Sequence, residues 1–320
     1  MSEEQSSPLS VLIIIPAYNA GGFLKEAIDS SLEQTYQHQR VVVINDASTD
    51  GTAELLSGYR DDSRLEVITN ERNLGKATSL NLLIDSAEED LVALMDADDV
   101  MYPDRIEKQV GFMLAHPKVG ASSGFMDYIS GEGRKIGRAK LDLLSDEVAQ
   151  RYVSDSDPFA IFCPCAILRR TMLHETGLRF RGQFWPADDI DMWNRIYESG
   201  WQVIVQEDVL MQYRIHGTSI VTSSFLKTRR QFEFVRACMR ARRNNEPEPT
   251  SGEFTAMMQN RPALVRFNSW RKTYAKGLYR GAGFAVAERR LLRAAWMLGV
   301  AVCLQTGYVV NRFKQQVLKK

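Results

Sequence analysis

Cysteine is scarce in this sequence of 320 residues, and its spacing excludes the common cysteine-based sites. Cys163 and Cys165 are separated by one proline, too close for a redox Cys-x-x-Cys motif, and Cys238 and Cys303 stand alone, so no paired zinc motif is present. So few thiols fit a reducing compartment. Residues 1–8 lack the basic and apolar segments of a secretory signal, and we therefore expect a cytoplasmic protein.

Two glycine-rich nucleotide-binding motifs are also missing. Gly75-Lys76 looks like the end of a P-loop, but Asn70 stands where that motif needs its first glycine, and Ala77 follows the lysine. No Gly-x-Gly-x-x-Gly follows the first hydrophobic run, which counts against a dinucleotide-binding domain.

The formal net charge is zero, but the charges are unevenly divided along the chain. Residues 1–224 carry 20 basic and 35 acidic side chains, a net charge of −15, and residues 225–320 carry 20 basic and 5 acidic, a net charge of +15. This asymmetry predicts two domains, 1–224 and 225–320, with different partners. No nucleic-acid recognition motif accompanies the basic part, so we expect no nucleic-acid partner.

Hydrophobic runs and helical spacing alternate through the first 115 residues. The expected strands are 9–15, 40–45, 64–69 and 90–95, and the helices that follow them are 21–35, 52–60, 76–87 and 103–115. This alternation predicts βαβ units and a parallel sheet with helices on both faces. Later expectations are strands at 119–129, 160–168, 202–206 and 209–214, a helix at 188–199, and helices alone after about residue 224.

Ligands bind such sheets at the carboxyl ends of the strands, and each of the four runs ends in polar residues. The fourth ends in Asp96-Ala97-Asp98-Asp99. Three carboxylates repel one another unless a cation lies among them, and Mg²⁺ is usually held by one or two carboxylates plus substrate phosphates. An acidic turn that caps the next helix would use the same residue types, so both interpretations stay open here.

Other candidate residues are also read in two ways. Asp188, Asp189 and Asp191 stand at the start of the helix expected at 188–199, where one carboxylate suffices as a cap and another is free to act as a general base. Lys76, at a helix start, either meets a phosphate or is a surface lysine. His216 is one of four histidines and can equally be structural.

Taken together, these residues resemble a family 2 glycosyltransferase over residues 9–220. The matching segments are Pro16-Ala17-Tyr18-Asn19, Ser31-Leu32-Glu33-Gln34-Thr35-Tyr36, residues 42–52, Asn73-Leu74-Gly75 with Asn81, Asp96-Ala97-Asp98-Asp99 with Pro103-Asp104-Arg105, Asp188-Asp189, and Tyr213-Arg214-x-His216. The resemblance implies the GT-A fold, a Rossmann-like α/β architecture of nucleotide-diphospho-sugar transferases with a mixed sheet flanked by helices. The C-terminal helices would be an extension of it.

The resemblance also implies roles for single residues. Those at the donor are Pro16, Tyr18, Asp46, Lys76 and Asp96, and those at the metal are Asp98 and His216. Asp189 would be the catalytic base, and Trp185 and Asp188 would lie toward the acceptor. The implied reaction is an inverting, metal-dependent transfer from a nucleotide-diphosphate sugar, with a UDP-sugar favoured, to a hydroxyl of a glycan or lipid-linked acceptor. The implied cofactor is Mn²⁺ or Mg²⁺.

Two positions depart from the family's usual pattern. Asn45-Asp46-Ala47 replaces the usual Asp-Asp-Gly, and Asp188-Asp189 replaces Glu-Asp. Two alternatives remain. A sugar nucleotidyltransferase would need an arginine-bearing, glycine-rich loop after the first strand, and residues 20–25 contain no arginine. A non-catalytic nucleotide-sugar or glycan-binding module would show damaged acidic sites, whereas these are intact.

The basic region 225–320 favours an anionic membrane surface as partner, since each Lys or Arg near such a surface contributes about 1 kcal/mol. The helix expected at 225–243 is amphipathic and basic. Residues 294–311 carry no charge and would extend about 27 Å as a helix, near the bilayer thickness. A membrane span, interfacial contact and soluble packing all stay open. Because the family usually builds surface polysaccharide, lipopolysaccharide or other glycoconjugates, the expected place is the inner face of the cell membrane.

Overall fold

The computed structural model describes residues 8–139, 145–155, 157–216, 225–287 and 290–317. The chain forms two compact units. The first unit runs through Ile129 and resumes over Gly137–Arg214, and the second unit comprises Ser130–Ile136 and the chain from Ile215 onward. The domain boundary predicted at residue 224 lies outside the described residues and stays a prediction.

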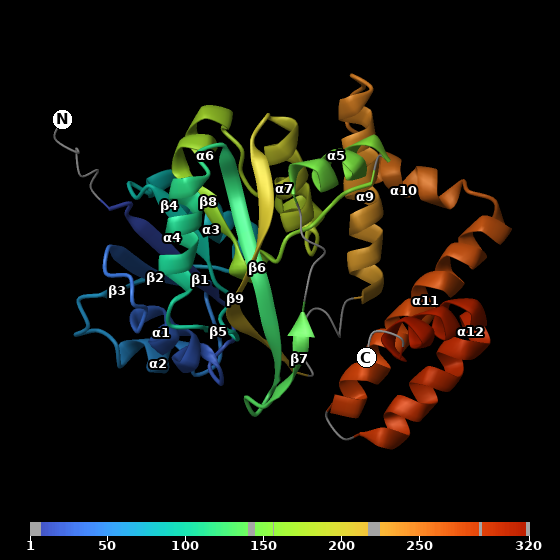
Figure 1. The fold of residues 1–320 in the computed structure, drawn as a ribbon, viewed down its shortest axis with the longest axis horizontal. Coiled ribbons are helices and arrows are strands. Elements are labelled where there is room, and N and C mark those ends of the chain that lie inside the picture. The colour runs from blue at the N-terminus through green and yellow to red at the C-terminus, as the bar shows by residue number, and fades with distance from the viewer. Residues whose placement is uncertain (1–7, 140–144, 156, 217–224, 288–289, 318–320) are drawn as a thin grey trace. The chain divides into compact units, whose positions relative to one another are not determined.

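A mixed sheet forms the centre of the first unit, with strand order β3-β2-β1-β4-β8-β6-β9-β5 (Figure 1). The parallel half consists of β3 (Leu65–Thr69), β2 (Gln39–Asn45), β1 (Val11–Ala17) and β4 (Leu91–Leu94). The other half consists of β8 (Ile167–Arg169), β6 (Val119–Ser130), β9 (Gln202–Ile215) and β5 (Val100–Met101). β8 pairs antiparallel with β4 and with β6, β9 pairs antiparallel with β5, and β7 (Lys135–Ala139) pairs with β6.

The central strands are apolar throughout because both faces of the sheet are covered. Alternate residues of β1 enter two separate cores: Leu12 and Ile14 on one face, and Val11, Ile13 and Ile15 on the other. The first core also includes residues of α3 (Lys76–Ser86), α5 (Asp146–Ser154), α6 (Arg170–Thr176) and α7 (Asp188–Glu198). The second includes residues of α1 (Leu24–Leu32), α2 (Thr52–Ser57) and α4 (Arg105–Ala115). Each fully buried Leu or Ile contributes roughly 1.5–3 kcal/mol.

The sequence-based expectations are confirmed for the four parallel strands and the helices between them, and the sheet as a whole is mixed, as the family resemblance implies. Strand 160–168 is wrong over most of its length, because Cys163–Cys165 form a 3₁₀ turn and only Ile167–Arg169 pair in the sheet. The two strands expected at 202–206 and 209–214 form one continuous strand, β9. The short strands β5 and β7 and the helix α5 were not predicted.

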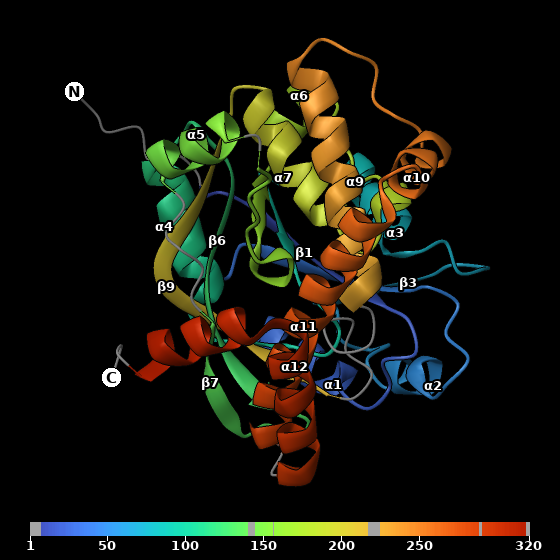
Figure 2. The same ribbon diagram turned by 90° about the vertical axis from the view of Figure 1, so that its right-hand side faces the viewer.

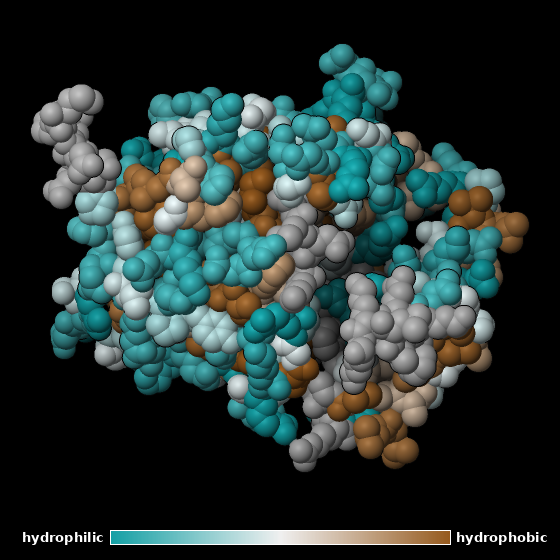
Figure 3. Space-filling view, viewed as in Figure 1, coloured by the Kyte–Doolittle hydropathy of each residue, from teal (hydrophilic) through white to brown (hydrophobic). Residues whose placement is uncertain are grey.

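From residue 225 onward the described part of the chain is helical, as expected. Its helices are α9 (Phe225–Arg243), α10 (Ser251–Gln259), α11 (Ala263–Ala287) and α12 (Leu291–Val317). A capping box between Thr250 and Glu253 begins α10. Helices α11 and α12 pack side by side as a hairpin (Figures 1 and 2), and the surface over them is rich in apolar residues (Figure 3).

Candidate active site

The acidic cluster, Asp96, Asp98 and Asp99, follows β4 at the carboxyl ends of the parallel strands. One oxygen from each of the three carboxylates lies within 4.8 Å of the others. Helix α4 begins only at Arg105, so the cluster does not cap it, and the capping interpretation is wrong. Hard oxygen ligands at this spacing suit a divalent cation such as Mg²⁺ or Mn²⁺.

Asp99 gives an independent sign that the cluster is short of positive charge. Its side chain is fully buried, and its Oδ1 accepts a hydrogen bond of 2.8 Å from the Arg214 amide. Its Oδ2 has no hydrogen-bond partner within the part of the chain that the structure describes. Burial first, and then the charges of Asp98 and Asp96, raise the pKa of Asp99 well above its usual range. The donor set and the orphaned oxygen both fit a cation.

Arg214, near the end of β9, holds the backbone of the acidic cluster in place. Its Nε donates to the carbonyl oxygen of Asp98 at 2.9 Å, and its Nη2 donates to Glu26 at 2.8 Å. The guanidinium lies 4.7 Å from the centre of the Phe23 ring. Arg214 is buried, and its backbone amide also donates to Asp99. These contacts hold the backbone at Asp98 and Asp99, and therefore fix the direction in which the Asp98 side chain leaves it.

Lys76, the first residue of α3, forms an ion pair with Asp96. Burial on its own lowers the pKa of Lys76, but the surrounding carboxylates, Asp96 above all, raise it well above its usual value. The side chain therefore stays protonated beside the acidic cluster. The ion pair holds Lys76 at the acidic cluster, and its contact with a phosphate stays a prediction.

Asp46, directly after β2, is engaged by the protein itself. Its Oδ1 accepts hydrogen bonds from Asn70 Nδ2 at 2.7 Å and from the Leu74 amide at 2.9 Å, and its Oδ2 accepts one from the Gly75 amide at 2.9 Å. Gly75 adopts a φ of 82°, which glycine tolerates without strain. Buried Asp46 thus fixes the turn that begins α3 and presents Lys76.

The loops after β1 and β2 are tied together. The Asn19 amide donates to Ser48 Oγ at 3.0 Å, and the Thr49 amide donates to Asn19 Oδ1 at 2.8 Å. Pro16 is the second-last residue of β1. Tyr18 follows the strand, and about half of its surface is exposed. An exposed aromatic ring at this edge of the sheet can stack on a planar ligand.

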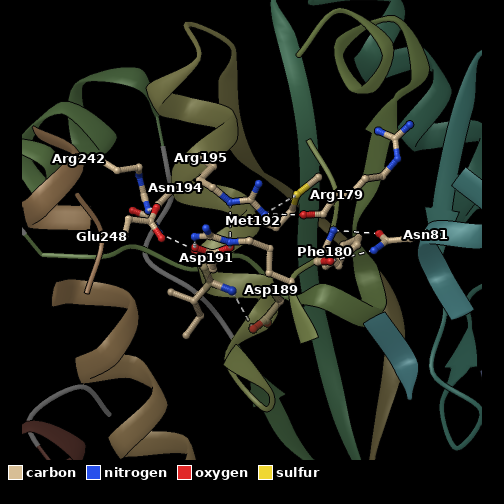
Figure 4. Close-up of polar contacts among 12 residues, drawn as sticks. Asn81, Arg179, Phe180, Asp189, Asp191, Met192, Asn194, Arg195, Arg242 and Glu248 are labelled. Atoms are coloured by element: carbon tan, nitrogen blue, oxygen red, sulfur yellow. Dashed lines mark hydrogen bonds and ion pairs between the residues drawn. The ribbon is translucent and has the colours of Figure 1, made fainter. Parts of the chain in front are cut away.

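The three carboxylates that begin α7 have different surroundings. Asp191 is fully buried and accepts hydrogen bonds from Arg181 at 2.5 and 2.9 Å and from Arg195 at 2.8 Å. Asp188 is also buried, and burial raises its pKa. Asp189 is partly exposed and lies apart from the Asp191–Arg195 pair (Figure 4).

Asp189 has the properties of a general base. Its Oδ1 accepts a hydrogen bond of 2.8 Å from the Ile190 amide. Burial, and next the charge of Asp188, raise its pKa to about 7. The same pKa is lowered by Lys76 and raised by Asp96, so the α7 carboxylates and the acidic cluster belong to one electrostatic site. A carboxylate that titrates near neutral pH is well matched to proton abstraction.

Asn81 of α3 holds the segment that leads to α7. Its side chain donates to the Phe180 carbonyl at 2.8 Å and accepts from the Phe180 amide at 2.9 Å (Figure 4). The turn Gly182–Phe184 then packs on α3, where Gly182 lies beside the side chain of Ala77. These contacts bring the start of α7 to the start of α3.

Residues 12–177, more than half of the chain, match the sequence profile of Glycosyl transferase family 2. This chain belongs to that family. An uncharacterized glycosyltransferase of Haemophilus influenzae is 31% identical over 222 residues, which cover 67% of this chain and 67% of the relative. The putative teichuronic acid biosynthesis glycosyltransferase TuaG of Bacillus subtilis is 26% identical over 219 residues, 67% of this chain and 82% of TuaG.

Solved structures confirm the GT-A fold of this glycosyltransferase. Residues 1–349 of S. aureus TarS, in complex with UDP-GlcNAc, align with a TM-score of 0.57 and 18% identity, over 96% of this chain and 92% of that one. The mannosyltransferase PcManGT of Pyrobaculum calidifontis, in complex with GDP-Man and Mn²⁺, aligns with a TM-score of 0.58 and 23% identity, over 93% and 87%. At these identities the likeness concerns the fold.

Of the residues that sequence reasoning selected in this glycosyltransferase, those in the first unit lie at the carboxyl edge of the sheet or at the start of α7. His216 belongs to the second unit, so its place at the metal stays a prediction. The roles of Trp185 and Asp188 toward an acceptor also stay predictions.

Two residues of the glycosyltransferase site have contacts that the sequence did not indicate. Buried Cys163 shares the electrostatic site, because burial raises its pKa and the charges of Lys76 and Asp189 act on it. Arg105, which stands in one of the segments that match the family, is fully buried in α4 and donates to the Leu94 carbonyl at 2.8 Å and to the Pro164 carbonyl at 3.1 Å. It joins the end of β4 to the Cys163–Cys165 turn. The motif includes Arg105, but these remote partners are not visible in the sequence.

Proposed function

We propose that this family 2 glycosyltransferase moves a sugar from a nucleotide-diphosphate sugar to an acceptor hydroxyl with inversion at the anomeric carbon. Asp189 takes the hydroxyl proton. The observation that carries this proposal is the place of Asp189 in the first turn of α7, next to Asp188 and in the same electrostatic site as Lys76 and the acidic cluster, where burial raises its pKa to about 7. General-base catalysis of this kind contributes roughly 10²–10⁴ in rate.

The donor is bound at the carboxyl edge of the sheet. Pro16, Tyr18 and Asp46 contact the nucleotide base, where Tyr18 offers an exposed ring and Asp46 fixes the adjoining turn. Lys76, which stays protonated, and Asp96 meet the ribose and diphosphate. A UDP-sugar is favoured, and the UDP-GlcNAc in the structurally similar TarS supports a donor of this class.

The acidic cluster would hold a divalent cation, Mn²⁺ or Mg²⁺, through Asp98. Its three converging carboxylates and the unpaired Asp99 Oδ2 support this assignment, as does the Mn²⁺ in PcManGT. When bound, the cation supplies charge neutralisation for the departing diphosphate. Arg214 contributes by holding the Asp98 backbone.

Trp185 and Asp188 face the acceptor, a glycan or a lipid-linked saccharide. The name of the relative TuaG supports a place in the synthesis of a cell-surface polysaccharide or glycoconjugate. Such an enzyme would work from cytoplasmic nucleotide sugars at the inner face of the membrane.

A panel of nucleotide sugars, assayed for release of the nucleoside diphosphate with and without Mn²⁺, tests the proposal. We expect Mn²⁺-dependent turnover of one or a few UDP-sugars, and a loss of at least 100-fold in Asp189→Asn with UDP binding retained. Exposed Glu175→Gln on α6 is the matched control. Near-full activity of Asp189→Asn would contradict the assignment of the base. Pyrophosphate release from a nucleoside triphosphate would favour the nucleotidyltransferase instead, and binding without turnover a non-catalytic module.

A further inference from the structure

Helix α12 of the second unit presents a mainly apolar outer face to solvent. Leu292 is 90% and Trp296 is 63% exposed. The other exposed residues of α12 before Gln305 are Leu291, Arg293, Ala295, Gly299, Val302 and Cys303, and Arg293 is the one charged residue among them. The opposite side of α12, with Ala301 and Val309, packs on Leu278 of α11. Soluble proteins rarely expose a continuous apolar face of this length unless it meets a partner.

A row of aromatic rings adds to the apolar surface of the hairpin. Phe267, Trp270 and Tyr274 of α11 are stacked one on the next, with ring centroids 6.0 and 5.3 Å apart, and all three are exposed. Trp and Tyr rings of this kind are enriched where a protein meets the membrane–water interface. The aromatic row is therefore of a kind that fits a membrane–water interface.

The charge of the hairpin points to the kind of lipid. Residues 263–320 carry 12 basic side chains and one acidic side chain. Burial first, and then the neighbouring cations Arg229, Lys272 and Arg312, lower the pKa of Lys276. Such a surface is attracted to anionic headgroups.

The shape of α12 decides between a helix that crosses the membrane and one that lies in its surface. Residues 291–312 are long and apolar enough to cross, and 17% of an apolar 18-residue window within them is buried. However, Gln305 has φ −156° and ψ 76°, so the helix is broken there (Figure 2). The arm before the break, residues 291–304, is about 21 Å long, whereas a span needs about 30 Å. A helical arm with an apolar face and a basic surround lies in the interface plane.

We propose that the α11–α12 hairpin docks this enzyme on an anionic phospholipid bilayer by inserting the outer face of α12 into the interface without crossing it. The inference deepens the membrane association proposed above. It assigns that association to one helix face and to one mode of binding.

Co-sedimentation of the full chain with vesicles tests the docking. We expect binding to vesicles of phosphatidylglycerol and phosphatidylethanolamine at least 10-fold tighter than to phosphatidylcholine, and weaker binding at high salt. Leu292→Glu with Trp296→Glu lowers the binding at least 20-fold. The control is Ala256→Glu with Met257→Glu on exposed α10, which adds the same charge to the same unit and leaves the binding within about twofold. Equal binding by both double variants would overturn the proposal.

Three further readouts separate the alternatives. Alkaline carbonate should release the enzyme from membranes of the producing cells, and resistance would show a span and overturn the interfacial mode. Light scattering without lipid should give the same mass for wild type and for the Leu292, Trp296 variant, and a dimer lost only in that variant would assign the face to a second copy. UDP release in solution should be equal in the wild type and in the Leu292, Trp296 variant. A wild type that binds vesicles but turns over no donor would refute the proposed function and leave the docking intact.

Discussion

Replacing Asp189 with asparagine removes one ionisable proton and keeps the shape of the side chain. In the folded protein the carboxyl has a pKa of about 7, against 3.8 when it is unperturbed. Between these two values the folded state binds a proton that the unfolded state has lost, so the free energy of unfolding falls as pH rises from about 4 to 7. The difference between these two pKa values sets an upper bound of about 4 kcal/mol on the change in the free energy of unfolding. Because Asp189 is partly in contact with water, we expect a change of about 1–2 kcal/mol.

Urea unfolding of wild type and Asp189→Asn in the presence of a chelator measures this effect. We expect the wild type to lose about 1–2 kcal/mol relative to the variant between pH 5 and pH 8, where deprotonation is complete. Glu175→Gln, a change of the same type at an exposed site, should follow the wild type. Parallel pH profiles for wild type and Asp189→Asn would refute the raised pKa.

The same pKa predicts the pH dependence of turnover. The base must be ionised, so kcat/KM for donor hydrolysis rises with pH up to about 7 at low Mn²⁺. Because the charge of Asp96 helps to raise the pKa of Asp189, a bound cation should move this ascending limb to lower pH. A limb that stays in place at saturating Mn²⁺ would contradict the link between the two groups.

Three other substitutions test the scaffold of the site. Arg214→Met removes the hydrogen bond to the Asp98 carbonyl and should weaken Mn²⁺ binding about 10–100-fold in a Mn²⁺ titration; unchanged affinity would argue against a positioning role. Ala47→Gly should raise the free energy of unfolding by about 0.5–1 kcal/mol, because Ala47 adopts a φ of 57°, and a lower Tm would contradict this. Asp191→Asn should lower the free energy of unfolding, measured with urea, by about 3–5 kcal/mol, because it leaves Arg181 short of its counter-charge. A decrease of less than about 1 kcal/mol would count against a structural ion pair.

The parallel half of the sheet could be predicted because its signal is local. Strands buried on both faces read as continuous β-branched runs, and each is followed by 3–4-residue spacing. Residues 160–165 are similarly apolar, but Pro164 stands inside a 3₁₀ turn, and buried Arg105 occupies the carbonyl of that proline. The competing turn depends on a residue 59 positions away in sequence, which periodicity does not reveal.

The candidate site divides in the same way. Asp96, Asp98 and Asp189 could be selected because each directly follows a strand or begins a helix. The partners that set their behaviour are remote: Arg214 binds the Asp98 carbonyl across 116 positions. The uncharged run of residues 294–311 was visible in the sequence, but the break at Gln305 was not, because glutamine is an ordinary helix former.

Calorimetric titration of UDP into the full chain, with and without Mn²⁺, tests the central claim most directly. The claim is that the carboxylate of Asp98 holds the cation on which nucleotide-diphosphate binding depends. We expect Mn²⁺ to raise the affinity for UDP at least 10-fold in wild type and in Asp189→Asn, but not in Asp98→Asn. UDP binding that is equally tight without Mn²⁺, or an enhancement that survives in Asp98→Asn, would contradict the account.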